Sequence, residues 1–260
     1  MQKSKRRIPL MGIEVDNVTL EEAVERVGYL AKSTLSSYVV TPNVDHIVRL
    51  QTDGKLKKAY DGASLVLADG MPLIWISKLY RTPIKEKVSG SDLFPKLCEF
   101  ARDNNLSMFF LGAAEGVAER AKENLQQRFP GLDICGCFSP EYGFEKDPDK
   151  VEEVLSIVRK ASPDILIVAL GCPKQEVLMS EHCSEMGVPV SLGLGASLDF
   201  EAGQSKRAPK WMQQHGLEWL YRMCAEPKRL VKRYLIDDAK IILIAWKYRP
   251  KEKCASIKSC

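Results

Sequence analysis

Long apolar runs are missing from this 260-residue chain. The longest run near its end, Ile241–Trp246, spans a third or less of the ~20 residues that a membrane-spanning helix requires. The N-terminal stretch MQKSKRRIPLMGIEV is basic, but its apolar part is too short and turns polar too soon for a signal peptide. We therefore expect a cytoplasmic protein that is either soluble or bound to a membrane surface.

Linkers, repeats and low-complexity tracts are also missing. No Pro/Gly/Ser-rich segment divides the chain, and no fixed period recurs along it. About 45% of the residues are apolar, which suffices for one complete α/β core. The sequence favours a single catalytic or binding body over several tethered modules.

The eight cysteines form neither a disulfide framework nor a metal-binding pattern. Cys135 and Cys137 make a CxC rather than a CxxC, and His46, His182 and His215 are not spaced as zinc ligands with them. We expect reduced thiols, no metal site and no cofactor, with His46 packing or capping locally. GxSxG is missing too, and so is a GxGxxG followed by an acidic residue, which disfavours a nicotinamide-dependent oxidoreductase.

Charge is unevenly distributed. From Gln204 to the end there are 14 Lys/Arg against 5 Asp/Glu, whereas the first 203 residues carry 24 against 29. A basic tail on a mildly acidic body indicates a polyanionic partner such as anionic lipid, a phosphorylated substrate or nucleic acid. Nucleic acid is disfavoured, because the tail has no known reading module and no interleaved aromatic platform.

Strand-like and helix-like segments alternate along residues 1–200. The alternation is typical of a Rossmann-like α/β fold with a largely parallel, doubly wound sheet. Runs such as ILIVAL favour strands covered on both faces. The predicted strands are Tyr38–Thr41, Ser64–Ala68, Ser107–Leu111, Leu132–Phe138, Ile165–Leu170 and Val188–Leu192. The predicted helices between them are Leu20–Lys32, Ser91–Asn104, Glu115–Arg128, Pro148–Lys160 and Pro173–Met186.

Residues 201–260 have a different pattern, with helical segments and no strand. We predict helices over Pro209–Gln214, Leu217–Cys224 and Pro227–Tyr248. The last of these mixes Leu230, Tyr234 and other apolar residues with lysines and arginines, as a helix lying in a membrane interface does. A helix packed on its own domain fits that pattern equally well.

Five predicted strands end in polar or glycine-rich turns: VVTPNVDH, LVLADG, FFLGAAEG, ALGCPKQE and SLGLGASLDFEAG. Ligands of open α/β sheets bind beyond the carboxyl ends of the strands, so these turns predict one shared site. GLGAS suits close approach to a ligand, because two glycines directly follow a strand. FFLGAAEG is equally compatible with a phosphate-binding turn and with a plain strand-to-helix turn.

Asp69 follows the run LVLA and precedes an expected helix, Met71–Leu79. It can cap that helix, act as a general base, or do both. A carboxylate flanked by apolar groups at a strand end is partly desolvated, which raises its pKa toward the range of a base. Asp147 and Asp149 form a DxD, but Asp147 before Pro148 is better explained as a helix cap than as a metal ligand.

The motifs TPNVDH, LADGMPLIW, VSGSDL, FFLGA, GCPKQE, GASLDFEAG and KRAPKWMQQHGLEWLYRMCAEPKRLVKRY together resemble the WecG/TagA/CpsF family of glycosyltransferases. The resemblance runs from about Pro9 to Tyr234, in the family's order. It implies an inverting transferase that moves N-acetylmannosamine from its UDP donor to the 4-hydroxyl of GlcNAc on undecaprenyl diphosphate. It also implies a peripheral protein on the inner face of the cell membrane, with the tail folded over the active site.

The resemblance assigns roles to individual residues. Asp69 stands at the position of the general base. No metal is implied, so cations of the protein would stabilise the leaving diphosphate. The implied substrate-binding residues are Thr41, Asn43, Lys87, Gln175, Arg222, Arg229, Lys232 and Arg233. The implied nucleotide-binding residues are Gly112, Tyr142, Gly195 and Asp199.

Two positions depart from the family pattern. Lys87 stands where an arginine is expected, which changes a bidentate phosphate grip into a point charge. Lys232 either replaces another arginine or leaves that role to Arg233. The alternatives to be weighed are a donor carrying N-acetylmannosaminuronic acid or glucose, and a non-catalytic protein that binds nucleotide sugar or lipid. A body detached from the membrane could also self-associate.

Overall fold

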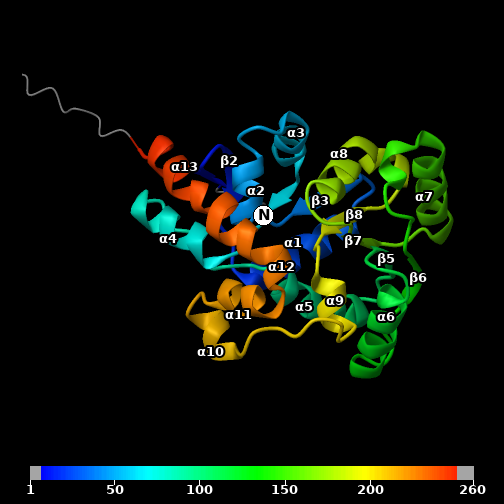
Figure 1. Ribbon diagram of the computed structural model, residues 1–260. Helices are drawn as coiled ribbons and strands as arrows, with labels where there is room; N and C mark the ends of the chain where they lie inside the picture. Colours follow the sequence, from blue (N-terminus) through cyan, green and yellow to red (C-terminus); the bar gives the residue numbers. More distant parts are fainter. Residues whose placement is uncertain (1–6, 251–260) are drawn as a thin grey trace, which may run out of the picture.

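A six-stranded, all-parallel sheet forms the centre of the molecule in a computed structural model that describes residues 7–250 (Figure 1). The side chains of Gln214 and Arg229 are not described. The strand order is β4-β3-β8-β7-β5-β6. The strands are β3 (Ser37–Val40), β4 (Leu65–Val66), β5 (Met108–Gly112), β6 (Ile134–Phe138), β7 (Ile165–Ala169) and β8 (Val190–Gly193). The predicted α/β class and all six predicted strands are confirmed, with ends that differ by at most two residues.

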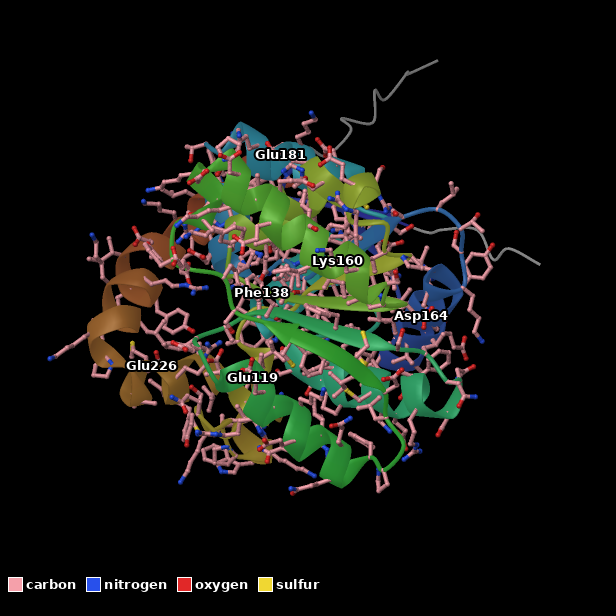
Figure 2. The ribbon with its side chains drawn as sticks, turned by 90° about the vertical axis from the view of Figure 1, so that its right-hand side faces the viewer. Glu119, Phe138, Lys160, Asp164, Glu181 and Glu226 are labelled. Carbon is pink, nitrogen blue, oxygen red and sulfur yellow. The ribbon has the colours of Figure 1, made fainter. Side chains whose placement is uncertain are left out.

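Side chains alternate between two apolar layers along each strand, as the period of two in a β-strand requires. In β7, for example, Leu166 and Val168 face one core cluster, and Ile165 and Ile167 face the other. Helices therefore cover both faces of the sheet (Figure 2). One layer holds α2 (Val44–Arg49), α3 (Gly54–Gly62), α4 (Met71–Leu79), α7 (Pro148–Ala161) and α8 (Lys174–Met186). The other holds α1 (Leu20–Ala31), α5 (Gly90–Asp103), α6 (Val117–Arg128) and α9 (Ser197–Glu201).

An antiparallel hairpin of β1 (Arg7–Leu10) and β2 (Ile13–Asp16) precedes the sheet and was not predicted. Its turn uses Gly12 at φ +93°. Asp16 then joins the hairpin to the sheet, because its carboxylate accepts the backbone N–H of Val66 at 3.0 Å and pairs with Arg7 and Arg26. The short apolar alternation in RIPLMGIEV was the available signal.

Helix starts follow local capping chemistry. Thr19 and Glu22 form a capping box on α1. Asp147 caps α7 with Pro148 in the first turn, and this cap was predicted from the sequence. Of the roles left open for Asp69, capping of α4 does not occur. The N-cap of α4 is Gly70, at φ +126°, and no side chain caps this helix. The carboxylate of Asp69 therefore does not stabilise the N-terminus of α4.

The C-terminal segment is helical and without strands over the described residues. It contains α10 (Lys210–Gln214), α11 (Glu218–Ala225) and α12 (Pro227–Lys232), and then a π-turn, η2 (Arg233–Asp237), a 3₁₀-turn, η3 (Asp238–Lys240), and α13 (Ile241–Lys247). One continuous α-helix over Pro227–Tyr248 was therefore the wrong prediction. The helical hydrogen-bonding pattern changes along this stretch, and Asp238 and Ile244 are buried against the body.

The C-terminal helices lie at the carboxyl edge of the sheet. In Figure 2, Phe138 at the end of β6 points toward the side where Glu226 lies, whereas Asp164, just before β7, lies at the opposite end. No helix in the described part of the chain is long and apolar enough to cross a bilayer. Residues 251–260, the end of the predicted 201–260 segment, lie outside the described part.

Candidate active site

A cavity of about 1030 Å³ opens at the carboxyl ends of β3, β4, β7 and β8. It lies where the chain leaves neighbouring strands in different directions, the usual ligand position of this architecture. The C-terminal segment forms its other wall. Among its lining residues are nine of the predicted site residues: Thr41, Asn43, Asp69, Lys87, Gln175, Gly195, Arg222, Lys232 and Arg233.

Asp69 sits at the end of β4, where its backbone N–H donates to the carbonyl oxygen of Pro42 at 2.8 Å. That bond ties the loops after β3 and β4 together. The side chain is partly exposed to the cavity but is densely surrounded by protein atoms. The backbone at Asp69 is thus held in place, and its carboxylate lies at the cavity surface.

Electrostatics prepare Asp69 for proton transfer. Burial raises the pKa of its carboxyl to about 7, with Glu218 and Asp92 acting in the same direction and Lys87 and Arg222 opposing them. At neutral pH the carboxylate is therefore present and its basicity is high, the combination that a general base needs.

Thr41 and Asn43 lie in the loop after β3, and both side chains have local partners. The Thr41 hydroxyl donates to the carbonyl oxygen of Gly193 at 3.1 Å, joining the ends of β3 and β8. The side chain of Asn43 caps α2 by accepting the backbone N–H of His46 at 3.2 Å. These bonds hold the loop in shape on one side of Asp69.

Gln175 is buried and connects two loops of the site. Its Oε1 accepts backbone N–H groups from Gly171 and Gly195, both at 3.2 Å, and its Nε2 donates to Glu176 at 2.8 Å. A Cβ at Gly193 would meet Nε2 at 2.9 Å, so a larger residue there would displace the amide of Gln175. The geometry gives Gln175 a positioning role between the ends of β7 and β8.

Lys87 reaches the cavity from the segment before α5. Its ammonium pairs with Asp92 at 3.0 Å, and Arg207 pairs with the same carboxylate at 2.8 Å. Burial raises the pKa of Asp92, but the Ser89 hydroxyl and the two cations outweigh it and lower that pKa to about 2. Arg207 was missed by the sequence interpretation, although it lies in the quoted motif KRAPKW.

The cations of the C-terminal segment have different surroundings. Arg233 is held between acids, 3.5 Å from Asp45 and 4.0 Å from Asp238. Lys232 is exposed at the cavity wall, and the guanidinium of Arg222 lies over the ring of Phe200, 5.6 Å from its centre. Arg222 and Lys232 are thus better placed than Arg233 to meet an anionic ligand.

Four predicted residues are not brought into the cavity lining. Gly112 ends β5, where a Cβ would meet the carbonyl oxygen of Ala169 at 2.6 Å, so tight packing accounts for this glycine. Tyr142 is 95% exposed, with the Lys174 ammonium 4.2 Å above its ring. Asp199 lies in α9, which contributes its neighbours to the wall instead. The side chain of Arg229 lies outside the described residues.

A polar cluster lies in the cavity wall, where His46 and Cys172 are lining residues. Donor atoms of His46, Cys172 and Glu176 lie within 4.8 Å of one another, and no second such group occurs among the described residues. His46 Nδ1 already bonds to the hydroxyl of Tyr60 at 2.7 Å, so the expected local packing of this histidine is confirmed. Burial lowers the pKa of His46, which keeps the ring neutral.

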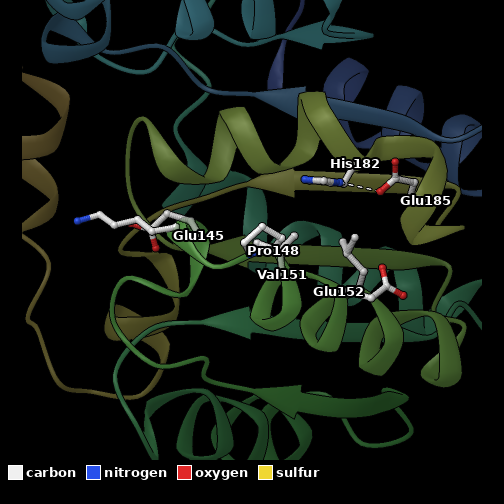
Figure 3. A pocket seen from close by; sticks show the side chains of 8 residues that line it. Glu145, Pro148, Val151, Glu152, His182 and Glu185 are labelled. Atoms are coloured by element: carbon white, nitrogen blue, oxygen red, sulfur yellow. Dashed lines mark hydrogen bonds and ion pairs between the residues drawn. The ribbon is translucent and has the colours of Figure 1, made fainter.

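A second, smaller cavity of about 270 Å³ lies between α7 and α8 (Figure 3). Its rim is largely acidic, and His182 pairs with Glu185 at 2.7 Å on one side. It shares no lining residue with the larger cavity. Of these two cavities in the described part of the chain, only the larger holds a carboxylate of raised pKa beside several cations.

A parallel α/β sheet whose carboxyl edge carries a carboxylate of raised pKa beside cations has the features of an enzyme acting on an anionic substrate. Comparison with known sequences defines the class. Residues 8–255 match the glycosyl transferase WecG/TagA/CpsF family, and the chain belongs to this family of glycosyltransferases.

Among its relatives are N-acetylglucosaminyldiphosphoundecaprenol N-acetyl-beta-D-mannosaminyltransferases of Staphylococcus aureus. Those of strains NCTC 8325 / PS 47 and MRSA252 are each 29% identical over 226 residues, covering 86% of this chain and 87% of the relative. Their name describes transfer of an N-acetyl-β-D-mannosaminyl group to N-acetylglucosaminyldiphosphoundecaprenol.

Proposed function

We propose that this glycosyltransferase moves N-acetylmannosamine from UDP-N-acetylmannosamine to the 4-hydroxyl of GlcNAc on undecaprenyl diphosphate. The product would carry a β-1,4 bond and would serve wall teichoic acid or a related surface glycopolymer. The observation that carries this proposal is Asp69, a carboxyl of pKa about 7 in a cavity walled by Lys87, Arg222 and Lys232. The name of the Staphylococcus relatives supports the choice of sugar and acceptor.

In the proposed reaction, Asp69 accepts the proton of the acceptor hydroxyl while its oxygen bonds to the anomeric carbon of the donor. The bond from that carbon to the diphosphate breaks on the opposite side, so the configuration inverts and UDP leaves with the electron pair. Positive side chains at the cavity wall would stabilise the charge that develops on the diphosphate. This chemistry needs no metal ion and no cofactor.

Several assignments of the substrate side belong to this proposal. Thr41, Asn43 and Gln175 would shape the sugar pocket through their backbone bonds. The nucleotide would lie near Gly195, with Gly112, Asp199 and Tyr142 as its outer predicted contacts. Arg229 and Arg233 are the remaining predicted cations of the substrate site. Arg233 would act mainly by attaching the C-terminal segment to Asp45.

We further propose that residues 1–200 form the catalytic body and that residues 201–260 bind the inner face of the cell membrane and complete the site there. The exposed apolar residues of the C-terminal segment support this division. Off the membrane, the same apolar surface could mediate self-association. Nucleic acid has no role in this account.

A donor panel tests the proposal directly. Purified protein is incubated with polyprenyl-diphosphate-GlcNAc and with UDP-N-acetylmannosamine, UDP-N-acetylmannosaminuronic acid or UDP-glucose, with and without EDTA. We expect the first donor to be used fastest and EDTA to have no effect. Faster use of another donor would reassign the sugar, and sensitivity to EDTA would overturn metal independence. Binding of donor and acceptor without turnover would identify a non-catalytic binding protein instead.

A further inference from the structure

Helix α4 carries an exposed apolar face although it belongs to the body and not to the C-terminal segment. Trp75 and Leu79, one helical turn apart, are 50% and 76% exposed. The opposite face is anchored firmly, since Leu73 and Ile74 are buried in the core and the Ser77 hydroxyl accepts the backbone N–H of Ile84 at 3.0 Å. The exposed face is therefore presented by a fixed helix.

Helix α13 presents a second apolar face beside it. Ile242, Leu243 and Trp246 are 72%, 71% and 65% exposed, while Ile244 turns into the core. The two helices lie side by side at the left of Figure 1, and the Tyr80 hydroxyl at the end of α4 donates to the carbonyl oxygen of Ala245 in α13. Their apolar residues form one surface, which we call the α4–α13 face.

The charge on this face has one sign. Neither helix contains Asp or Glu, and Lys78 and Lys247 are exposed on them. Arg249 follows α13, and its guanidinium lies 4.8 Å from the ring centre of Trp246, whereas Lys240, just before α13, is paired with Asp237 at 3.6 Å. A second copy packed on this face would bring cations against cations. An anionic bilayer supplies the complementary charge and accepts the tryptophans at its interface.

The face also reaches the active site. Trp75 and Ile242 line the cavity that holds Asp69, so the cavity opens onto the α4–α13 face. Asp69 is separated from the first residue of α4 by Gly70 alone. The position of α4 therefore determines how far the carboxylate lies from whatever surface the helix contacts.

We propose that α4 is a membrane-docking helix of the body that forms, with α13, one bilayer-facing surface and sets the distance of Asp69 from the lipid. The inference deepens the proposed function and rests on it for the identity of the acceptor. A lipid-linked acceptor would then place its sugar in the cavity while its chain leaves across Trp75 and Ile242. Only Gly70 lies between Asp69 and the docking helix, so the base and the membrane contact are closely joined in the chain.

The test uses the full-length protein and vesicles of phosphatidylcholine with or without phosphatidylglycerol. Leu79→Glu places a negative charge on the face without touching the cavity lining. Leu35→Glu is the matched control, since Leu35 is 74% exposed in the loop before β3, at the opposite edge of the sheet. We expect Leu79→Glu to weaken binding to anionic vesicles about tenfold or more, and Leu35→Glu to leave it within about twofold.

Turnover separates this inference from the proposed function. With a short-chain, water-soluble acceptor, Leu79→Glu should match the wild type, whereas with acceptor embedded in vesicles it should lose most of its rate. Wild-type vesicle binding by Leu79→Glu would overturn the role of α4 and leave the proposed function intact. A changed oligomeric state with unchanged vesicle binding would also overturn it, by assigning the face to self-association. Absence of turnover by the wild type on either acceptor would count against the proposed function alone.

The depth of α4 in the bilayer can be measured independently of transferase activity. A variant that keeps Trp75 as its only tryptophan, with Trp211, Trp219 and Trp246 changed to Phe, reports on α4 directly. We expect brominated lipids in anionic vesicles to quench its fluorescence. Fluorescence unaffected by brominated lipid, in a variant that still sediments with the vesicles, would show that α4 stays out of the bilayer and would refute the inference.

Discussion

The two walls of the active-site cavity are built in different ways. On the side of the sheet, Thr41 and Gln175 are buried and hydrogen-bonded between strand ends, and Asp69 is tied to the neighbouring loop. On the other side, few described side chains of the C-terminal segment are buried, mainly Leu230, Asp238 and Ile244. The sheet side holds Asp69 together with one cation, Lys87, and the sparsely buried C-terminal segment brings Arg222 and Lys232.

The two walls are suited to different parts of the proposed reaction. A proton acceptor needs a constant environment, because its pKa depends on how completely water is excluded. Cations that hold a diphosphate can arrive on a separate element, since charge–charge attraction acts over several ångströms. Changes in the sheet wall should therefore alter proton transfer, and changes in the segment should alter the handling of the leaving group.

The largest expected effect is on the sheet wall. Asp69→Asn removes the proton acceptor at nearly constant shape, and transfer should fall by about 10²–10⁴-fold. Binding of UDP, measured by calorimetry, should stay within about threefold of the wild type, since no contact to a cation is lost. Turnover unchanged by this substitution would eliminate Asp69 as the base.

The same variant should be more stable at alkaline pH. The pKa of Asp69 is raised in the folded protein, so the wild type loses stability as pH rises from about 4 through about 7. The Tm of Asp69→Asn at pH 8 should exceed that of the wild type by about 2–4 °C. This is the shift that a gain of about 1 kcal/mol in the free energy of unfolding produces in a chain of this size. The advantage should vanish near pH 4, where both proteins are neutral at this position.

On the segment side, Arg222→Ala should reduce kcat by about 10²–10³-fold by removing one stabilising cation. Arg222→Lys keeps the charge and should recover part of the rate, measured with the same acceptor. The acid limb of Arg222→Lys should stay close to the wild-type position, whereas that of Arg222→Ala should move slightly to higher pH, because Arg222 lowers the pKa of Asp69 by a small amount. If the acid limb of an Arg222 variant moved as far as that of a sheet-wall variant such as Asp92→Asn, the two walls would not have the separate roles assigned to them.

A smaller effect is expected from Asp92→Asn, which acts through the sheet wall. Asp92 holds Lys87 at 3.0 Å and also opposes ionisation of Asp69 by its own charge. Removing that charge and releasing Lys87 both favour the Asp69 carboxylate. The acid limb of kcat/KM should move to lower pH by about 0.5–1 unit. A shift to higher pH would contradict the assigned role of Lys87.

The smallest effect is expected where the segment meets α2. Burial raises the pKa of Asp238 to about 6, partly offset by Arg233, so its ionised form destabilises the attachment above that pH. Asp238→Asn should raise Tm at pH 8 by about 1–2 °C and leave it unchanged near pH 4. A lower Tm at pH 8 would mean that the Arg233 ion pairs outweigh the burial of the charge.

The sequence allowed the body to be predicted well. Continuous apolar runs such as Ile165–Leu170 are covered on both faces, and polar turns after them meet at one edge because parallel strands end together. The positions of Asp69 and Gln175 after two such strands were therefore enough to predict that both belong to one site. The hairpin of Arg7–Asp16 was missed because two four-residue strands leave little periodic signal.

The C-terminal segment could be predicted only coarsely. Its helical character was evident, but the π-turn at Arg233–Asp237 begins at a residue whose partner, Asp45, lies far away in the sequence, and no local pattern encodes that contact. Arg207 was passed over for the same reason, since its partner Asp92 lies more than a hundred residues earlier. The capping role expected for Asp69 failed because Gly70 supplies the needed backbone conformation itself.

The pH dependence of kcat/KM for the wild-type enzyme, with UDP-N-acetylmannosamine and a lipid-linked GlcNAc acceptor, tests the central claim most directly. A single base of pKa about 7 predicts a tenfold loss of rate per pH unit on the acid side, with the bend near pH 7. A profile that is flat from about pH 5 to pH 8 would contradict a general base whose pKa is raised by burial.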